Sequence, residues 1–391
     1  MTAPGAPRFT IFLLSLAAFA SAASMRVTDA MLPRLATQFG VGLAQAATVI
    51  TVFAVAYGAL QVAFGPLGDR FGKLRVISLA CIGAAASTLA CLLAPGYSTF
   101  VAARLVAGAF CGGVIPLSMA WLGDVVPYAE RQPVLARFLL GQILGLGGGA
   151  AIGGIAAEHE SWRWPFAVLA LWLLAMAMLL LPASRRDPVT HRAPGGNFAK
   201  GLLQVLHLRW ARVVVATVFS EGLVVFGALA FVPTHLHAAR GFTLSHAGLA
   251  MLLFAAGGVI FALLAGPVLR RLGEVGLAAT GTALIAAGFV LIAWTPYAAV
   301  APAGCLVAGL GFYMLHNTLQ ANGTQMAPQR RGAGMALFAS LYFTGQAIGV
   351  AIAGEVAERW APGAVIGAAA IAILPIGFNF ARLRRRHPAA N

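Results

Sequence analysis

Long apolar stretches, separated by short polar or breaker-rich segments, fill most of the chain. Each stretch is about as long as the roughly 20 residues that a helix needs to cross the hydrocarbon core of a bilayer. A helix pairs its backbone groups internally, so it is the element expected in lipid. The pattern predicts an all-α membrane protein with twelve spans, at 9–36, 46–66, 75–94, 98–122, 132–157, 162–182, 211–237, 244–269, 276–296, 299–325, 333–357 and 362–382.

The chain also repeats itself. Segment 65–73, which follows the second span, recurs as segment 266–274 after the eighth span, 201 residues later. The same offset relates Gly108 to Gly309. Such repeats are typical of transporters whose binding site lies between the repeated halves. We therefore predict two six-helix bundles, at 1–182 and 211–391, joined by a cytoplasmic linker at 183–210, with a short basic tail after the last span.

Composition and charge refine this picture. Hydrophobic residues make up 60% of the chain and charged residues 9%, whereas soluble domains carry about 25% charged residues. The net charge of +15 would suit a nucleic acid, but twenty of the Lys and Arg residues fall in segments on one predicted side of the membrane. The other side holds only Arg34, Arg163, Arg240 and Arg359.

The positive-inside rule makes the basic side cytoplasmic. The excess of positive charge is thus explained by membrane topology, and we expect no nucleic-acid partner. The sequence predicts a multi-pass protein of a bacterial inner membrane with both termini in the cytoplasm.

Three motifs carry a resemblance to a known family. Gly65-x-Leu67-x-Asp69-Arg70-x-Gly72-Lys73-x-Arg75 resembles the signature of the loop between spans 2 and 3 in the major facilitator superfamily. Thr28-Asp29-Ala30-Met31-Leu32-Pro33 in span 1 and Arg104-x-x-x-Gly108 in span 4 resemble the twelve-span drug/proton antiporters of the bicyclomycin and chloramphenicol resistance type. The resemblance implies two pseudo-symmetric bundles, efflux of drug-like molecules coupled to protons, and a monomer.

Two positions depart from the antiporter pattern. Span 5 of those antiporters usually reads Gly-Pro-x-x-Gly-Gly, whereas this chain has Gly149-Ala150-Ala151-Ile152-Gly153-Gly154 and lacks the proline. In span 4, Ala107 stands where a glutamine often precedes the motif glycine. Both departures weaken the assignment to antiport.

The loop between spans 2 and 3 is a candidate conformational latch. The resemblance implies that Asp69 faces the N-terminal end of span 11, where the helix dipole favours a carboxylate. Basic residues of the loop are expected to pair with acidic residues at the end of span 4 when the cytoplasmic side is closed. The alternative is a positively charged turn without a conformational role. The predicted latch residues are Gly65, Asp69, Arg70, Gly72, Lys73, Asp124 and Glu130.

Ionisable residues inside the spans are candidate functional groups, because burying an unpaired charge is costly. Arg26 and Asp29 share a helix face at i, i+3 spacing, and Arg104 lies at a similar depth in span 4. Two interpretations stay open: a structural ion network that ties spans 1 and 4, or direct binding of substrate or proton. The arginine beside Asp29 stabilises its charged form, which disfavours Asp29 as a proton carrier.

Glu221 has a different setting, about ten residues into span 7 with no basic residue within one helical turn. Loss of water favours the neutral form of such a carboxyl, which suits a group that binds and releases a proton. Glu221 is therefore the first choice for proton coupling, and Asp29 the second. The alternative is a structural partner for an arginine of the other bundle.

The resemblance further implies that spans 1, 4, 7 and 10 line a central cavity. The predicted substrate-binding residues are Arg26, Asp29, Tyr57, Arg104, Glu221, Phe226, His316, Asn317 and Gln320.

No metal, cofactor or enzymatic site is expected. The four cysteines lie inside apolar spans without ligand spacing, as small buried hydrophobes do. His235 and His237 fit a solvated surface better than a metal site. Segment 145–150 matches a dinucleotide motif but lies within a span and follows no strand, and segment 68–74 lacks the spacing of a P-loop. The glycines of span 5 are expected to let spans 5 and 8 pack closely.

The sequence thus favours a proton-coupled exporter of small organic or amphiphilic molecules that works by alternating access in the bilayer. The alternative is a proton-coupled importer of a small organic solute, such as an anion attracted by Arg26 and Arg104. A membrane sensor or an enzyme would need an appended domain or a catalytic cluster, which the pattern does not show.

Overall fold

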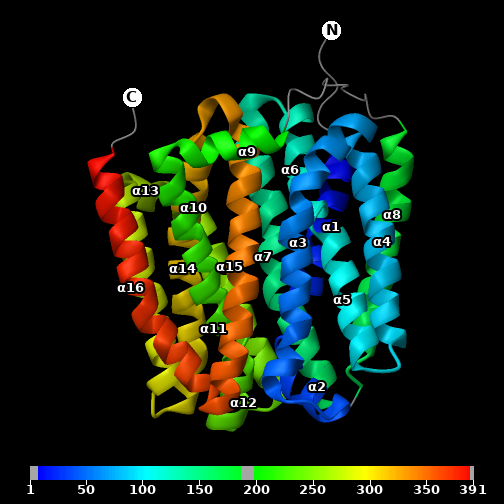
Figure 1. Ribbon diagram of the computed structural model, residues 1–391, viewed down its shortest axis with the longest axis vertical. Coiled ribbons are helices and arrows are strands. Elements are labelled where there is room, and N and C mark those ends of the chain that lie inside the picture. Colours follow the sequence, from blue (N-terminus) through cyan, green and yellow to red (C-terminus); the bar gives the residue numbers. More distant parts are fainter. Residues whose placement is uncertain (1–7, 160, 186–197, 388–391) are drawn as a thin grey trace.

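The computed structural model describes residues 8–159, 161–185 and 198–387. In this part of the chain, helices stand side by side, with α1 beginning and α16 ending at the same end of the molecule (Figure 1). We call this end the termini face and the other end the opposite face. The first half contains α1 (Arg8–Arg26), α2 (Leu32–Phe39), α3 (Leu43–Phe71), α4 (Lys73–Leu93), α5 (Tyr97–Cys111), α6 (Val114–Val125), α7 (Tyr128–Glu158) and α8 (Trp164–Ser184).

The second half repeats this arrangement and adds a helix before it. Its helices are α9 (Phe198–His207), α10 (Arg209–Glu221), a π-helical turn (Gly222–Phe226), α11 (Gly227–Leu229), α12 (Val232–Arg240), α13 (Leu244–Trp294), α14 (Ala301–Gln325), α15 (Arg331–Arg359) and α16 (Pro362–Arg386). Short 3-10 turns at Ala298–Val300 and Pro328–Arg330 precede α14 and α15.

The twelve predicted spans are confirmed. Eleven continuous helical stretches of the described chain are long and apolar enough to cross a membrane. One of them, α13, has 51 residues, and Gly273 breaks it with φ 63° and ψ 176°. These angles lie outside the helical region and suit glycine, which lacks a Cβ. The helix therefore turns back at Gly273 and supplies both the eighth and the ninth span.

Three of the spans are interrupted along their length. Span 1 leaves the helix between α1 and α2, span 4 breaks between α5 and α6, and span 7 contains the π-helical turn. Non-helical backbone at membrane depth is tolerated where it is buried in protein, and π-turns occur frequently at functional sites. Asp29 lies inside the first interruption, and Glu221 directly precedes the third.

The internal repeat recurs as matched close contacts between helices. A Cβ placed on Gly108 would lie 2.3 Å from the carbonyl oxygen of Phe53, and one on Gly309 would lie 2.1 Å from that of Phe254. Both members of the second pair follow the first by 201 residues. Only glycine allows backbones to approach this closely. The same glycine-dependent contact therefore holds each half together.

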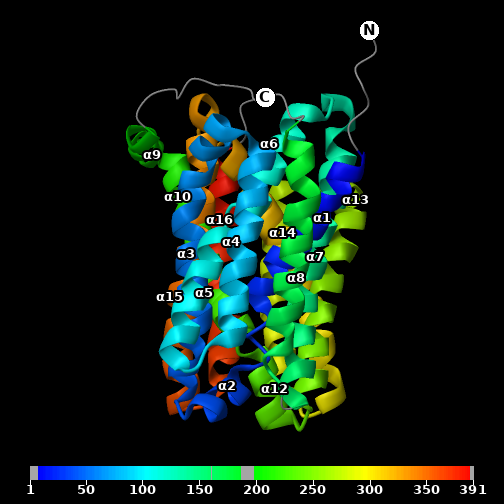
Figure 2. The same ribbon diagram turned by 90° about the vertical axis from the view of Figure 1, so that its right-hand side faces the viewer.

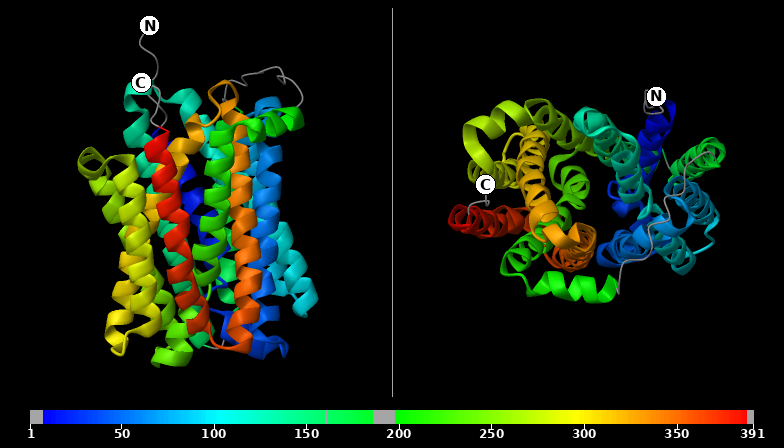
Figure 3. Two further views of the ribbon diagram at one scale, coloured as in Figure 1. Left: turned by 60° about the vertical axis from the view of Figure 1, so that its left-hand side comes forward. Right: turned by 90° about the horizontal axis from the view of Figure 1, so that it is seen from above.

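The two halves meet along two seams, where α7 packs on α13 and α3 packs on α15 (Figure 3). In the first seam, a Cβ on Gly154 would lie 2.3 Å from the carbonyl oxygen of Leu244, and one on Gly248 would lie 2.6 Å from that of Ala150. The predicted close packing of spans 5 and 8 through small residues is thus confirmed.

Part of the segment predicted as a linker is helical. Residues 186–197, which hold most of its prolines and glycines, lie outside the described residues, but α9 runs across the termini face (Figures 1 and 2). Leu203 and Leu206 of α9 are exposed. The breakers at positions 194–196 dominated the sequence pattern, so the short amphipathic run after them was missed.

The outer surface of the bundle is apolar. Large side chains such as Leu171 and Leu263 are 67% and 75% exposed. A soluble protein rarely exposes wide apolar surfaces, whereas lipid solvates them. The four basic residues predicted for the sparsely charged side lie in or beside α2, α8, α12 and α15, at the opposite face.

Candidate functional site

The carboxyl group of Glu221 is fully buried and pairs with a histidine of another span. Its Oε2 lies 2.7 Å from Nδ1 of His316 on α14, while its Oε1 has no hydrogen-bond partner. The His316 ring stacks on Phe312 at 5.1 Å between ring centroids and contacts Tyr342 at 4.8 Å. A titratable pair therefore sits among aromatic side chains. The sequence predicted both members, but their pairing across 95 residues was not predicted.

Arg26 and Asp29 form the ion pair that their spacing predicted. Nη1 of Arg26 lies 2.9 Å from Oδ2 of Asp29, and both side chains are buried. The guanidinium group also lies over the ring of Phe226, 4.4 Å from its centroid. Because Phe226 belongs to the π-helical turn of span 7, Arg26 bridges the two halves. Nη2 of Arg26 and Oδ1 of Asp29 have no hydrogen-bond partner.

Arg104 ties spans 1 and 4, as the structural interpretation expected, but its hydrogen bonds go to backbone carbonyl groups and not to Asp29. Arg104 donates hydrogen bonds to the carbonyl oxygens of Ser24, at 2.7 Å, and Val49, at 3.4 Å, and lies over the ring of Phe53. Ser24 stands in the last turn of α1, where carbonyl groups lack helical donors. Arg104 thus supplies a hydrogen-bond donor to a carbonyl group at the broken end of α1. Its contacts with backbone groups tie spans 1, 2 and 4 together.

The remaining predicted residues divide between the interface and the exposed surface. Tyr57 is buried and lies 4.4 Å from Phe343 of the other half, ring centroid to ring centroid. Asn317 is exposed and Gln320 half-buried on α14, and neither joins the buried polar pairs described above.

Gln346 of α15 was missed as a site residue. It is fully buried, with Nε2 3.9 Å from the sulfur of Met25 in the first half and Oε1 without a partner. A signal existed in the sequence, because Gly345-Gln346 repeats Gly141-Gln142. The repeat indicated this position, but glutamine carries no charge, and the search for buried ionisable residues therefore did not include it.

The loop between α3 and α4 is held by Lys73. Its Nζ lies 2.5 Å from Asp124 and 3.4 Å from Asp69, which places Asp124 where the sequence predicted an acidic partner. These three residues belong to one half, so the contact does not require the halves to close. Arg70 lies over the ring of Phe71. Among the described residues, Asp69 pairs with Lys73 and not with α15, so its role as a latch stays a prediction.

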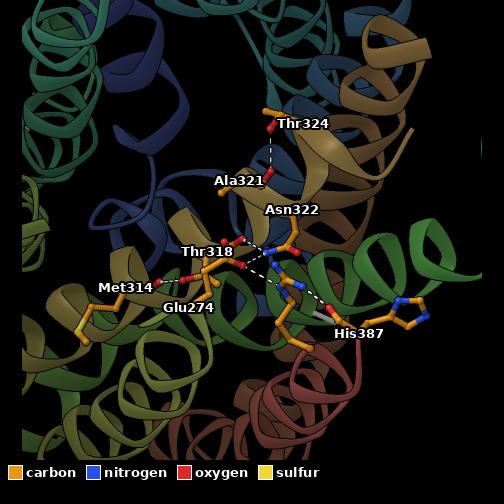
Figure 4. A network of polar contacts seen from close by, with 8 residues as sticks. Glu274, Met314, Thr318, Ala321, Asn322, Thr324 and His387 are labelled. Carbon is orange, nitrogen blue, oxygen red and sulfur yellow. Dashed lines mark hydrogen bonds and ion pairs between the residues drawn. The ribbon is translucent and has the colours of Figure 1, made fainter. Parts of the chain in front are cut away.

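The second copy of this loop carries its own anion. Oε2 of Glu274 accepts hydrogen bonds from Nε of Arg384, at 2.8 Å, and from Nδ2 of Asn322, at 3.0 Å (Figure 4). These residues join α13, α14 and α16 at the termini face. Arg270 stands where the first copy has Asp69, so the anion of this loop lies at another position. Glu274 follows Lys73 by 201 residues. The second copy therefore has a negative side chain at the position where the first copy has a positive one.

The cysteines match their prediction, whereas the expected solvated surface is wrong for His235, which is buried. All four cysteines are buried, as predicted. Nε2 of His235 lies 3.1 Å from the carbonyl oxygen of Ile292, and Nδ1 of His237 lies 2.7 Å from that of Phe242. These contacts connect the end of span 7 to its neighbours.

Comparison with known proteins identifies the family. The model of the Major Facilitator Superfamily matches residues 14–350, which is most of the chain, so this chain belongs to the major facilitator superfamily. It is a multi-pass membrane transporter.

Relatives in sequence include a transporter and a protein named for drug export. The chain is 25% identical over 335 residues to the uncharacterized MFS-type transporter YceJ of Bacillus subtilis, with 83% of each chain covered. It is 28% identical over 180 residues to the multidrug export protein EmrB of Escherichia coli, which covers 46% of this chain and 35% of EmrB.

Solved structures share the fold. The nucleoside transporter NupG superposes with a TM-score of 0.80 at 15% identity, covering 95% of this chain and 98% of NupG. A bacterial homolog of the human lysosomal transporter Spinster, in an inward-facing and unoccupied conformation, superposes with a TM-score of 0.77 at 17% identity, covering 97% of each chain.

Proposed function

We propose that this protein is a proton-coupled transporter of a bacterial inner membrane that exports small organic or amphiphilic molecules by alternating access. The observation that carries the proposal is the buried pair of Glu221 and His316 beside the π-helical turn of span 7. A carboxyl group with one unpartnered oxygen in an apolar setting is a functional candidate within a membrane. The termini face is cytoplasmic in this proposal, and the protein acts as a monomer.

Proton binding at Glu221 is coupled to movement through the surrounding contacts. The π-helical turn begins one residue after Glu221 and ends at Phe226, on which Arg26 of the other half rests. Neutralising Glu221 changes the charge next to His316 and thereby the packing of span 7 against span 1. Asp29 is already ion-paired with Arg26, so it is the second candidate. The proton is the coupling ion, and no cofactor takes part.

Aromatic side chains around these charges suit amphiphilic substrates. Phe226 contacts Phe312 and Tyr342, with ring centroids 5.2 and 5.6 Å apart. Aromatic faces bind flat apolar groups and cations alike. Export is favoured because relatives in sequence are named the multidrug export protein EmrB, the multidrug efflux pump LfrA and the puromycin resistance protein pur8.

The second candidate function is import of a small organic anion together with protons. It is favoured by buried guanidinium nitrogens without a hydrogen-bond partner, Nη2 of Arg26 and Nη2 of Arg104. An anion would satisfy them. In this case proton and substrate move in the same direction.

The test is flux in liposomes under an imposed pH gradient. Purified protein is reconstituted, and amphiphilic drugs and organic anions are offered to the wild type and to Glu221→Gln. We expect drug movement opposite to the proton flow, reduced at least tenfold in Glu221→Gln because glutamine cannot carry the proton. Glu355→Gln is the matched control, since it removes an exposed carboxylate of α15 whose ion pair is with Arg359 of its own helix.

Either of two other results would contradict part of the proposal. Substrate movement along with the protons would establish the importer. Gradient-driven flux of Glu221→Gln equal to that of the wild type would make Glu221 structural and direct the same test to Asp29.

A further inference from the structure

Two carboxylates join the halves at the opposite face. Glu158 is the last residue of α7, and its Oε2 accepts a hydrogen bond of 2.9 Å from the backbone N–H of Ser245 at the start of α13. Glu358 lies near the end of α15, and its Oε2 accepts one of 2.6 Å from the backbone N–H of Ala44 at the start of α3. In each case the donor belongs to the other half of the chain.

The two contacts are copies of each other within the internal repeat. Glu158 and Glu358 are 200 residues apart, and Ala44 and Ser245 are 201 residues apart, close to the offset that relates the halves. In both, a carboxylate at the end of one helix meets the first turn of a helix across the seam. The N–H groups of a first helical turn lack helical partners, and the helix dipole favours a negative charge there.

Glycines bring the halves close enough for these contacts. A Cβ on Gly42 would lie 2.4 Å from Oε1 of Glu358, and one on Gly354 would lie 3.1 Å from Cα of Ala44. The seam is therefore tight at the opposite face.

We infer that Glu158 and Glu358 are a matched pair of latches that hold the opposite face closed and must release whenever that face opens. The inference rests on the alternating access of the proposed function and adds the residues that govern one of its two states. Neither contact survives separation of the halves, because each joins a side chain of one half to the backbone of the other. Removing the latches shifts the equilibrium toward the state that is open at this face.

The first experiment measures the distance across the opposite face. Spin labels are placed at Gln38→Cys in α2 and Ala239→Cys in α12, both exposed, after the four buried cysteines are replaced by alanine. Glu158→Ala, Glu358→Ala and their combination are compared with the wild type by pulsed electron resonance. Each single variant is expected to raise the ratio of long to short distances about three- to tenfold, and the combination more, because each removes one charged helix cap.

Two variants make the comparison specific. Glu158→Gln combined with Glu358→Gln is expected to fall between the wild type and the alanine variant, since an amide oxygen still accepts a hydrogen bond but carries no charge. Glu355→Ala removes a carboxylate of α15 only one turn from Glu358 and is expected to leave the distances unchanged. An unchanged distribution in the double alanine variant, or an equal shift in Glu355→Ala, overturns the inference.

A second experiment needs no spin label. A Cβ on Gly354 would lie 3.5 Å from the Cβ of Ala44, within the range of a disulfide. Ala44→Cys and Gly354→Cys are therefore expected to cross-link rapidly under mild oxidation, and several-fold more slowly when Glu158→Ala is added in the other seam. Equal rates would overturn the inference. Neither experiment uses substrate or a proton gradient, so failure here is distinct from failure of the proposed transport activity.

Discussion

Each buried charge of this protein is balanced by a different kind of partner. Asp29 balances Arg26, His316 contacts Glu221, and backbone carbonyl groups accept the hydrogen bonds of Arg104. Leaving a charge buried without a partner is strongly destabilising, so the partner indicates what each residue can do. A partner that can itself titrate, as His316 can, permits a change of protonation. Fixed carbonyl groups permit none, and we therefore predict that Arg104 is the structural member of the set.

Replacement of Arg104 by lysine tests this distinction. Lysine keeps the charge, but its single ammonium group cannot reproduce the fork that reaches Ser24 and Val49. We expect the free energy of unfolding to fall by about 1–3 kcal/mol, the penalty for leaving buried polar groups unsatisfied. Thermal unfolding in detergent measures the effect, with exposed Arg359→Lys as the control. Full stability together with lost transport would instead place Arg104 in the substrate site.

At the scale of elements, glycines set the distances between helices. Within each half, Gly108 packs against the backbone of Phe53 and Gly309 against that of Phe254. Between the halves, Gly154 and Gly248 do the same for α7 and α13. Helices in lipid gain little from the hydrophobic effect, so close van der Waals contact between backbones has to supply association. This requirement explains why glycines repeat at matched positions of the two halves.

The matched glycines give a paired prediction. Gly108→Ala and Gly309→Ala each add a methyl group where the backbone leaves no room, and each is expected to destabilise the protein by about 1–3 kcal/mol, as overpacking does. Gly123→Ala is the control, because nothing lies within 4 Å of its added Cβ and alanine is the better helix former. Melting temperatures in detergent decide the matter. A drop for only one of the two would contradict their equivalence.

At the scale of the whole molecule, charge separates the two faces. The opposite face holds the basic residues Arg34, Arg163, Arg240 and Arg359 at or beside helix ends. The termini face holds clustered arginines at the start of α10, beside the turn at Gly273 inside α13, and at the end of α16. Translocation of positively charged loops is disfavoured, so this asymmetry sets the orientation in the membrane. The proposed direction of export depends on that orientation.

Cysteine labelling in intact cells tests the orientation. Gln38→Cys and Ala239→Cys on the opposite face are expected to react with a membrane-impermeant maleimide added outside, whereas Arg270→Cys and Gly332→Cys on the termini face are expected to react only after permeabilisation. The native cysteines are all buried, which keeps the background low. Labelling in the reverse pattern would invert the proposed topology, and with it the direction in which substrate is moved.

The sequence by itself determined the architecture. Lipid requires every spanning segment to be helical and apolar, so span number and approximate position follow from local pattern alone, including the turn at Gly273 inside α13. The repeat is found by comparing one part of the chain with another, and Arg26 and Asp29 are only three residues apart. Both could be read without knowing which helices are neighbours.

Only the tertiary structure decided which distant residues meet. The contact of Glu221 with His316, the binding of Arg104 to the broken end of α1, and the capping of α3 and α13 by Glu358 and Glu158 all join different spans. A helix fixes the spacing of its own side chains, but its rotation and its neighbours are set by packing across the whole bundle. Backbone carbonyl and N–H groups are also the same in almost every residue. The sequence therefore does not indicate which of them a distant side chain will contact.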